Sequence, residues 1–121
     1  MNIYFDGSGW NKRESKFCVV FGNGQPTIIR RFTENKTNNE MEYAGLLEAL
    51  THAKPGDEIF TDSQLIYHQV FTRKYRVKKE HIKLLAEKAI HLIQTKKVTL
   101  TWIPREQNKA GHVLENAGRR V

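Results

Sequence analysis

The spacing of apolar residues in this 121-residue chain changes at residue 38, and that change limits the folds open to it. Before it, residues 2–7, 16–21 and 27–33 have the alternating or continuous apolar pattern of strands. The turn sequence Gly-Asn-Gly-Gln-Pro at 22–26 joins the last two runs as a hairpin. After it, apolar residues recur every three or four positions, as on one helix face. Thr37 followed by Glu40 has the form of a capping box and predicts the helix start.

The second half of the chain continues with helices and short strands. We expect a strand at 58–61, a short helix from Ser63 to about Phe71, a longer amphipathic helix around 82–93, and a strand at 98–103. A short helix follows from Asn108 into the tail. The order βββαβααβα predicts a single α/β domain over residues 1–121, with a mixed five-stranded sheet. An antiparallel hairpin part is followed by parallel strands joined through helices.

Charge indicates the class of partner. The formal net charge is +7 and the pI is about 9.7, which favours a polyanion such as nucleic acid. Cations at a helix N-terminus oppose the helix dipole, so a basic run in that place is easier to explain if phosphates bind there. A merely solvated basic face remains the alternative. The run consists of Arg73, Lys74, Arg76, Lys78 and Lys79.

Several other functions are not expected from the composition. No apolar run approaches the roughly 20 residues that span a membrane. The N-terminus enters a strand pattern at once, unlike a signal peptide. Cys18 is the only cysteine and lies in an apolar run, which favours a buried, reduced thiol. We therefore expect a cytoplasmic monomer with neither a membrane partner nor a small-molecule cofactor.

Three acidic residues stand at unusual positions. Asp6 and Asp62 each close a predicted strand, where open α/β sheets place their ligands. Glu42 lies on or beside the helix face that should pack on the sheet, where a carboxylate is poorly solvated. Taken singly, they fit a turn residue, a helix cap and an edge acid. Together they predict a site of hard oxygen ligands for two Mg²⁺ or Mn²⁺ ions, ~3.5–4 Å apart, suited to phosphodiester cleavage.

The motifs around these acids resemble those of the type 1 ribonuclease H family, especially its short forms without a basic protrusion. The match runs from Ile3 to about Leu114. The three ordered motifs that contain the acids, at compatible spacing, make it specific. The matching segments are Asp6-Gly7-Ser8-Gly9, Thr37-Asn38-Asn39-Glu40-Met41-Glu42-Tyr43, Thr61-Asp62-Ser63-Gln64 and the run from Trp102 to Asn108.

The resemblance implies a ribonuclease H-like three-layer fold, with helices on both faces of the sheet. It implies a nuclease that cuts the RNA strand of RNA–DNA hybrids and leaves 3′-hydroxyl and 5′-phosphate ends. Asp6, Glu42 and Asp62 would be the catalytic metal ligands, and Thr37 would help to hold a DNA phosphate. The residues implied to line the RNA minor groove and sense its 2′-hydroxyls are Gly7, Ser8, Asn38, Asn39 and Gln64. Arg73, Lys74 and Arg76 add the basic contacts inferred from charge.

One position departs from the family pattern. The last family motif is Asn-x-x-Ala-Asp-x-Leu, and His112 stands in the place of its aspartate. We hypothesise that His112 is a catalytic metal ligand, which would favour Mn²⁺ over Mg²⁺ because imidazole suits transition metals. It is otherwise a bystander, and Glu115, one turn further on, is a third option for the missing carboxylate.

Two other functions remain open. A binding module on the same fold would hold hybrids or structured RNA without cutting, and the altered fourth position favours it. Clustered carboxylates count against it, because a pure binder of polyanions gains nothing from them. A DNA nuclease or resolvase is disfavoured by the Thr37-Asn38-Asn39 segment and by Gln64.

Overall fold

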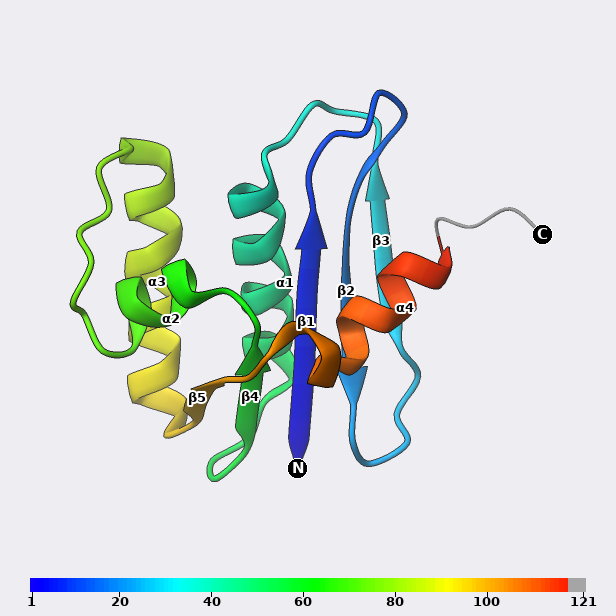
Figure 1. Ribbon diagram of the computed structural model, residues 1–121. Helices are drawn as coiled ribbons and strands as arrows, with labels where there is room; N and C mark the ends of the chain where they lie inside the picture. The colour runs from blue at the N-terminus through cyan, green and yellow to red at the C-terminus, as the bar shows by residue number, and fades with distance from the viewer. Residues whose placement is uncertain (118–121) are drawn as a thin grey trace.

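A mixed five-stranded sheet forms the centre of the molecule in the computed structural model, which describes residues 1–117. Its strand order is β3-β2-β1-β4-β5 (Figure 1). β2 pairs antiparallel with both β1 and β3, whereas β1–β4 and β4–β5 are parallel. The predicted hairpin and the parallel second half are therefore confirmed. The strands are β1 (Asn2–Ser8), β2 (Ser15–Phe21), β3 (Ile28–Phe32), β4 (Glu58–Thr61) and β5 (Thr99–Trp102).

The helices begin close to where the sequence placed them. The capping box is present at α1, with the Glu40 amide donating to Thr37 Oγ1 and the Thr37 amide donating to the Glu40 carboxylate. Ser63 caps α2 by accepting from the Ile66 amide. The final helix ends at Ala117, and the rest of the tail lies outside the described residues. The bounds are α1 (Asn38–His52), α2 (Gln64–Val70), α3 (Glu80–Lys96), the 3-10 turn η1 (Arg105–Gln107) and α4 (Lys109–Ala117). Over residues 1–117, no helix combines the length and apolar character needed to cross a bilayer.

The two faces of the sheet carry cores of different size. Ile3 and Phe5 of β1 enter the large core that α1 and α3 share with the sheet. On the opposite face, Cys18 of β2 packs with Ala110 and Leu114 of α4 in a small cluster. Helix α4 packs on β1 and β2, and Figure 1 shows it in front of β2. Cys18 is fully buried, as predicted.

Gly7 marks the closest approach between the sheet and a helix. A Cβ atom at this position would lie 2.3 Å from the Glu42 amide nitrogen and 2.3 Å from the Met41 carbonyl carbon. β1 runs through Gly7 to Ser8, whereas the sequence pattern placed Asp6 at the end of the strand. The strand continues because Gly7 and Ser8 pair with Phe17 and Lys16 of β2. Asp6 therefore lies within the strand rather than at its end.

We expect Gly7→Ala to lower the free energy of unfolding by about 1–3 kcal/mol, because the added methyl group meets backbone atoms that cannot rotate away. Urea denaturation measures this. Ser8→Ala is the matched control, since it adds no atoms to the same strand and should change the stability by less than about 0.5 kcal/mol. Equal stabilities of Gly7→Ala and the control would contradict the contact.

Candidate metal centre and nucleic-acid interface

The three predicted acids converge on one site. One oxygen each from Asp6, Glu42 and Asp62 can be chosen so that all lie within 4.8 Å of one another. Asp6 comes from the middle of β1, Glu42 from the second turn of α1, and Asp62 from the residue that follows β4. Asp6 is 4% exposed, and the other two are partly buried. The structure thus brings together, from three elements, the carboxylates that the sequence singled out.

Hydrogen bonds hold the third acid in place. Asn108, fully buried at the start of α4, donates from Nδ2 to Asp62 Oδ2 at 2.9 Å and to the Phe5 carbonyl oxygen at 2.9 Å. Its Oδ1 accepts from the Ala110 amide. The indole nitrogen of Trp102 donates to the Asp62 carbonyl oxygen at 3.1 Å. A single amide side chain therefore ties α4, β1 and the loop after β4 together. The sequence marked Asn108 as part of a motif but did not show this role.

Burial and mutual repulsion perturb two of the carboxyl groups. Burial, and then the nearby charge of Asp62, raise the pKa of Asp6 to about 7. Burial, and then the charge of Asp6, raise the pKa of Glu42 to about 7. The guanidinium of Arg105 acts in the opposite direction and lowers both pKa values, but less strongly. Within the described residues, the cluster is therefore short of positive charge.

That donor set fits divalent metal ions. Hard carboxylate oxygens are the ligands that Mg²⁺ and Mn²⁺ take in proteins, and a cation would relieve the repulsion that raises the two pKa values. The divalent metal ions that the sequence implies thus fit the residues present. Asp6, Glu42 and Asp62 are the side chains that would hold it.

A cavity of about 330 Å³ opens beside Asp6 and Glu42. Ser8 and Asn38, both predicted to contact substrate, line it together with Gly7. The amide oxygen of Asn38 also accepts from the Gly9 backbone at 2.6 Å, so its NH₂ group is left to face a ligand. Two cations that the sequence analysis overlooked, Lys16 and Arg105, share the lining. Lys16 could have been noticed, because it is a charged residue within β2 that directly precedes the apolar run Phe17–Phe21.

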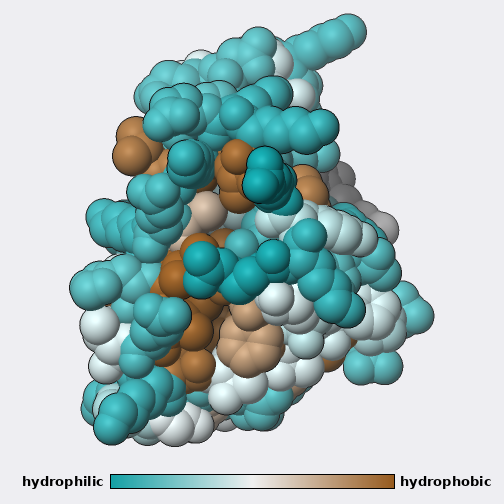
Figure 2. Space-filling model, turned by 90° about the vertical axis from the view of Figure 1, so that its left-hand side faces the viewer, coloured by the Kyte–Doolittle hydropathy of each residue, from teal (hydrophilic) through white to brown (hydrophobic). Residues whose placement is uncertain are grey.

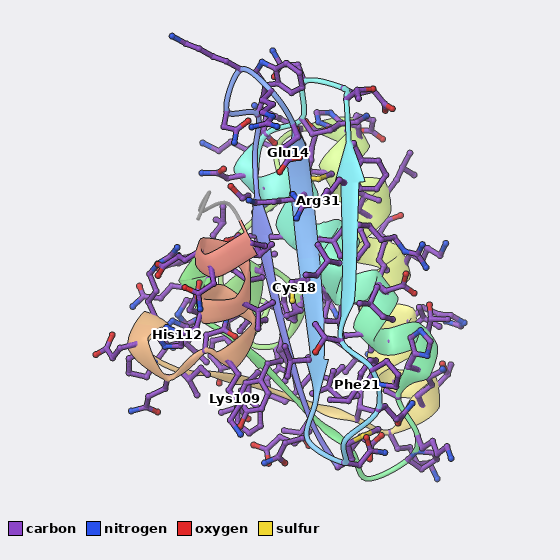
Figure 3. The ribbon with its side chains drawn as sticks, turned by 90° about the vertical axis from the view of Figure 1, so that its right-hand side faces the viewer. Glu14, Cys18, Phe21, Arg31, Lys109 and His112 are labelled. Carbon is purple, nitrogen blue, oxygen red and sulfur yellow. The ribbon has the colours of Figure 1, made fainter. Side chains whose placement is uncertain are left out.

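The structure does not bring His112 to the carboxylates. Its side chain is exposed, and Nε2 lies 2.7 Å from the Glu106 carbonyl oxygen, so that nitrogen carries a proton. Figure 3 shows His112 on the side of α4 away from the sheet, whereas Cys18 on β2 lies between the layers. Gly111 faces the acids instead, with a Cβ position 3.4 Å from Asp6 Oδ2. The ligand role of His112 stays a prediction.

Glu115 lies nearer to the site than the sequence suggested. It lines the cavity with Asp6 and Glu42, and its charge contributes to the raised pKa of Asp6. Its Oε1 is 3.8 Å from Arg105 Nη2, an exposed ion pair that costs little to rearrange. Glu115 therefore has access to the carboxylate cluster from the same helix that carries His112.

The remaining predicted contacts gather elsewhere. A second hollow of about 430 Å³, lined by α1, α2 and the segment before α3, contains Thr37, Asn39 and Arg76. Asn39 Oδ1 is buried there without a hydrogen-bond partner among the described residues. Figure 2 shows apolar surface in a hollow framed by hydrophilic residues on the α3 side of the molecule. Arg73 lines an adjoining hollow with Arg76. Lys74 and Gln64 are exposed, and neither lines the acid cavity.

Comparison with known proteins identifies the family. The family model described as RNase H matches residues 1–117. The structure is similar to LC11-RNase H1 isolated from compost, at 26% identity and a TM-score of 0.76, over 93% of this chain and 90% of that one. It is also similar to RNase H1 of the archaeon Halobacterium salinarum, at 24% identity and a TM-score of 0.75, over 93% and 92% of the two chains. The N-terminal RNase H domain of Rv2228c from Mycobacterium tuberculosis matches at 19% identity with a TM-score of 0.73, over 98% and 97%. The predicted ribonuclease H-like fold is confirmed.

The raised pKa values predict how pH and metal change stability. Between about pH 4 and 7 the folded protein holds protons on Asp6 and Glu42 that the unfolded chain has released. Without metal, these groups therefore make the free energy of unfolding fall as pH rises through that window, by at least about 1 kcal/mol. Asp6→Asn should reduce the fall, and Mg²⁺ should stabilise the wild type more at pH 8 than at pH 5.5.

Urea denaturation in EDTA and in Mg²⁺ at several pH values measures both effects. Glu87→Gln, which removes an exposed carboxylate on α3, is the matched control and should behave like the wild type. A pH dependence that is unchanged in Asp6→Asn, with no stabilisation by Mg²⁺ at pH 8, would contradict the cluster's role.

Proposed function

Because the chain belongs to the RNase H family, we propose that it is a metal-dependent endonuclease that hydrolyses the RNA strand of RNA–DNA hybrids. The observation that carries this proposal is the convergence of Asp6, Glu42 and Asp62, whose oxygens approach within 4.8 Å of one another. The cluster lies beside an open cavity on a protein of net charge +7. A site that only bound a polyanion would gain nothing from buried carboxylates next to phosphate.

The chemistry follows from the carboxylates and their supports. Two divalent ions, Mg²⁺ or Mn²⁺, would supply a water deprotonated at neutral pH and charge stabilisation for the leaving oxygen. Asp6, Glu42 and Asp62 would hold the ions, and Asn108 keeps the Asp62 carboxylate oriented. Cleavage between phosphorus and the 3′-oxygen leaves a 3′-hydroxyl and a 5′-phosphate.

Recognition of the hybrid is divided between the two hollows. In the acid cavity, Ser8 and Asn38 present a hydroxyl and an amide, which can donate to or accept from a 2′-hydroxyl. In the second hollow, Thr37 and Arg76 suit the backbone of the DNA strand, and Asn39, predicted to contact the RNA strand, lines the same hollow. The hybrid-bound crystal structure of LC11-RNase H1, 23% identical to this chain with a TM-score of 0.72, supports a hybrid as the ligand.

We expect the wild type to cut the RNA strand of a labelled hybrid in Mg²⁺ or Mn²⁺, and Asp62→Asn to lose at least about a hundredfold in rate. Removing one of the carboxylates leaves the ions with too little compensating charge. Gel analysis of the end-labelled RNA strand measures this, with double-stranded DNA of the same sequence as the substrate control.

Each outcome has a clear meaning. If the wild type cuts the hybrid, Asp62→Asn does not, and double-stranded DNA stays intact, the result supports the proposed nuclease activity. Intact hybrid in both metals, with hybrid binding retained, replaces the nuclease with a binding module on the same fold. Cutting of double-stranded DNA at a similar rate would indicate a DNA nuclease.

The identity of the fourth ligand on α4 can be tested by metal binding. Three carboxylates leave a charge of +1 on two divalent ions, and Glu115 lines the cavity whereas His112 faces away. We expect Glu115→Gln to weaken Mn²⁺ binding roughly tenfold, and His112→Ala to leave both the affinity and the ratio of Mn²⁺ to Mg²⁺ activity unchanged. Titration calorimetry measures the affinities. The opposite pattern would support the sequence prediction that His112 is a ligand and favours Mn²⁺.

A further inference from the structure

Lys16 of β2 is buried in a way that is unusual for lysine. It is 6% exposed, and lysine is rarely buried without a partner. The nearest carboxylate is that of Glu14, whose Oε2 lies 3.6 Å from Lys16 Nζ. The same oxygen already accepts a hydrogen bond of 2.6 Å from Arg31 Nη1, on the side of the sheet shown in Figure 3. Glu14 is therefore shared and only partly compensates the ammonium group.

The ammonium group of Lys16 has donors to spare. Within residues 1–117, Lys16 Nζ donates no hydrogen bond, although an ammonium group can donate three. The nitrogen is not fully buried either. Among the described residues, Asn39 Oδ1 is the fully buried polar side-chain atom without a hydrogen-bond partner, and Lys16 Nζ is not in that class. The tip of Lys16 thus reaches accessible space while its stem is covered.

That accessible space is the acid cavity. Lys16 pairs with Ser8 in the β1–β2 register, and Cys18, two residues on, pairs with Asp6. Alternate residues of a strand share a face, so Lys16, Ser8 and Asp6 point to the same side of the sheet. Lys16 lines the cavity together with both of these residues.

The buried charge of Lys16 is not the main counter-charge of the Asp6 and Glu42 carboxylates. Arg105 is the cation that chiefly lowers the pKa of Asp6 and of Glu42, and Lys16 is not among the main causes of either shift. A buried positive charge that lines an open cavity, and whose hydrogen-bond donors are free, is suited to an anion from outside. A compact ammonium group with free donors binds single phosphate oxygens well.

We propose that Lys16 binds a backbone phosphate of the RNA strand, at the nucleotide whose 2′-hydroxyl reaches Ser8. The inference rests on the proposed function, because it takes the strand in the acid cavity to be RNA. Lys16 is then a substrate-binding residue placed by strand register. Its charge is held in position by the buried stem, so little side-chain entropy is lost when the phosphate binds.

The test compares binding of a fluorescent RNA–DNA hybrid to wild type, Lys16→Met and Lys16→Arg. Lys88→Met, which removes one exposed charge on α3, is the matched control. Fluorescence anisotropy in EDTA prevents cutting, and repetition in Mg²⁺ with Asp62→Asn as the background includes the metal. We expect Lys16→Met to raise the Kd roughly tenfold and to reduce the slope of log K against log salt by about one. Lys16→Arg should stay within about twofold of the wild type.

Neutral linkages identify the strand. A set of hybrids carries one methylphosphonate at successive positions of either strand. The wild type should lose affinity at one RNA-strand linkage beside the acid cavity, and Lys16→Met should show no further loss at that linkage. An equal loss in both proteins, or a Lys16-dependent loss only on the DNA strand, would overturn the proposal.

The outcomes separate this inference from the proposed function. Hybrid cutting by the wild type, with Lys16→Met binding like Lys88→Met, would refute the role of Lys16 alone. A Lys16-dependent phosphate contact in a protein that never cuts would refute the nuclease alone. Circular dichroism checks the fold of each variant, and Lys16→Gln replaces Lys16→Met if the latter does not fold.

Discussion

The contact between the backbones of β1 and α1 at Gly7 sets the geometry of the whole site. Because no Cβ separates them, the Glu42 amide lies against the strand next to Asp6, and two carboxylates meet in a mostly buried place. Their repulsion and loss of hydration are unfavourable, as the raised pKa values of both groups indicate. The apolar core beneath them, with Phe5 and Leu46 fully enclosed, provides the opposing stabilisation.

Helix α4 closes the other side of the site through one polar anchor and one apolar anchor. Asn108, which directly precedes the helix, donates hydrogen bonds to Asp62 and to β1, and Leu114 packs with Cys18. These two anchors determine the rotation of the helix. His112 is thereby turned toward the Glu106 carbonyl, and Glu115 toward the acid cavity. The side chain that α4 presents to the acid cavity is thus a consequence of how the helix packs on the sheet.

The start of α1 divides the nucleic-acid surface into two parts. Asn38 lines the acid cavity, whereas its neighbours Thr37 and Asn39 line the second hollow with Arg76. In the proposed complex, this one turn of helix would contact both strands of the duplex, with hydroxyl recognition on one side and phosphate binding on the other. Lys16 adds a positive charge to the acid side, where the net charge of the chain alone would not have placed it.

The sequence by itself determined the order of elements, the capping box of α1 and the identity of the three acids, because periodicity and short-range motifs are local properties. It also led to the correct family. Only the tertiary structure decided which side chains share a cavity. The inward position of Lys16 depends on strand register, and the outward position of His112 depends on the rotation of α4. Both result from contacts between segments far apart in the chain, such as Asn108 with Phe5, which no local pattern encodes.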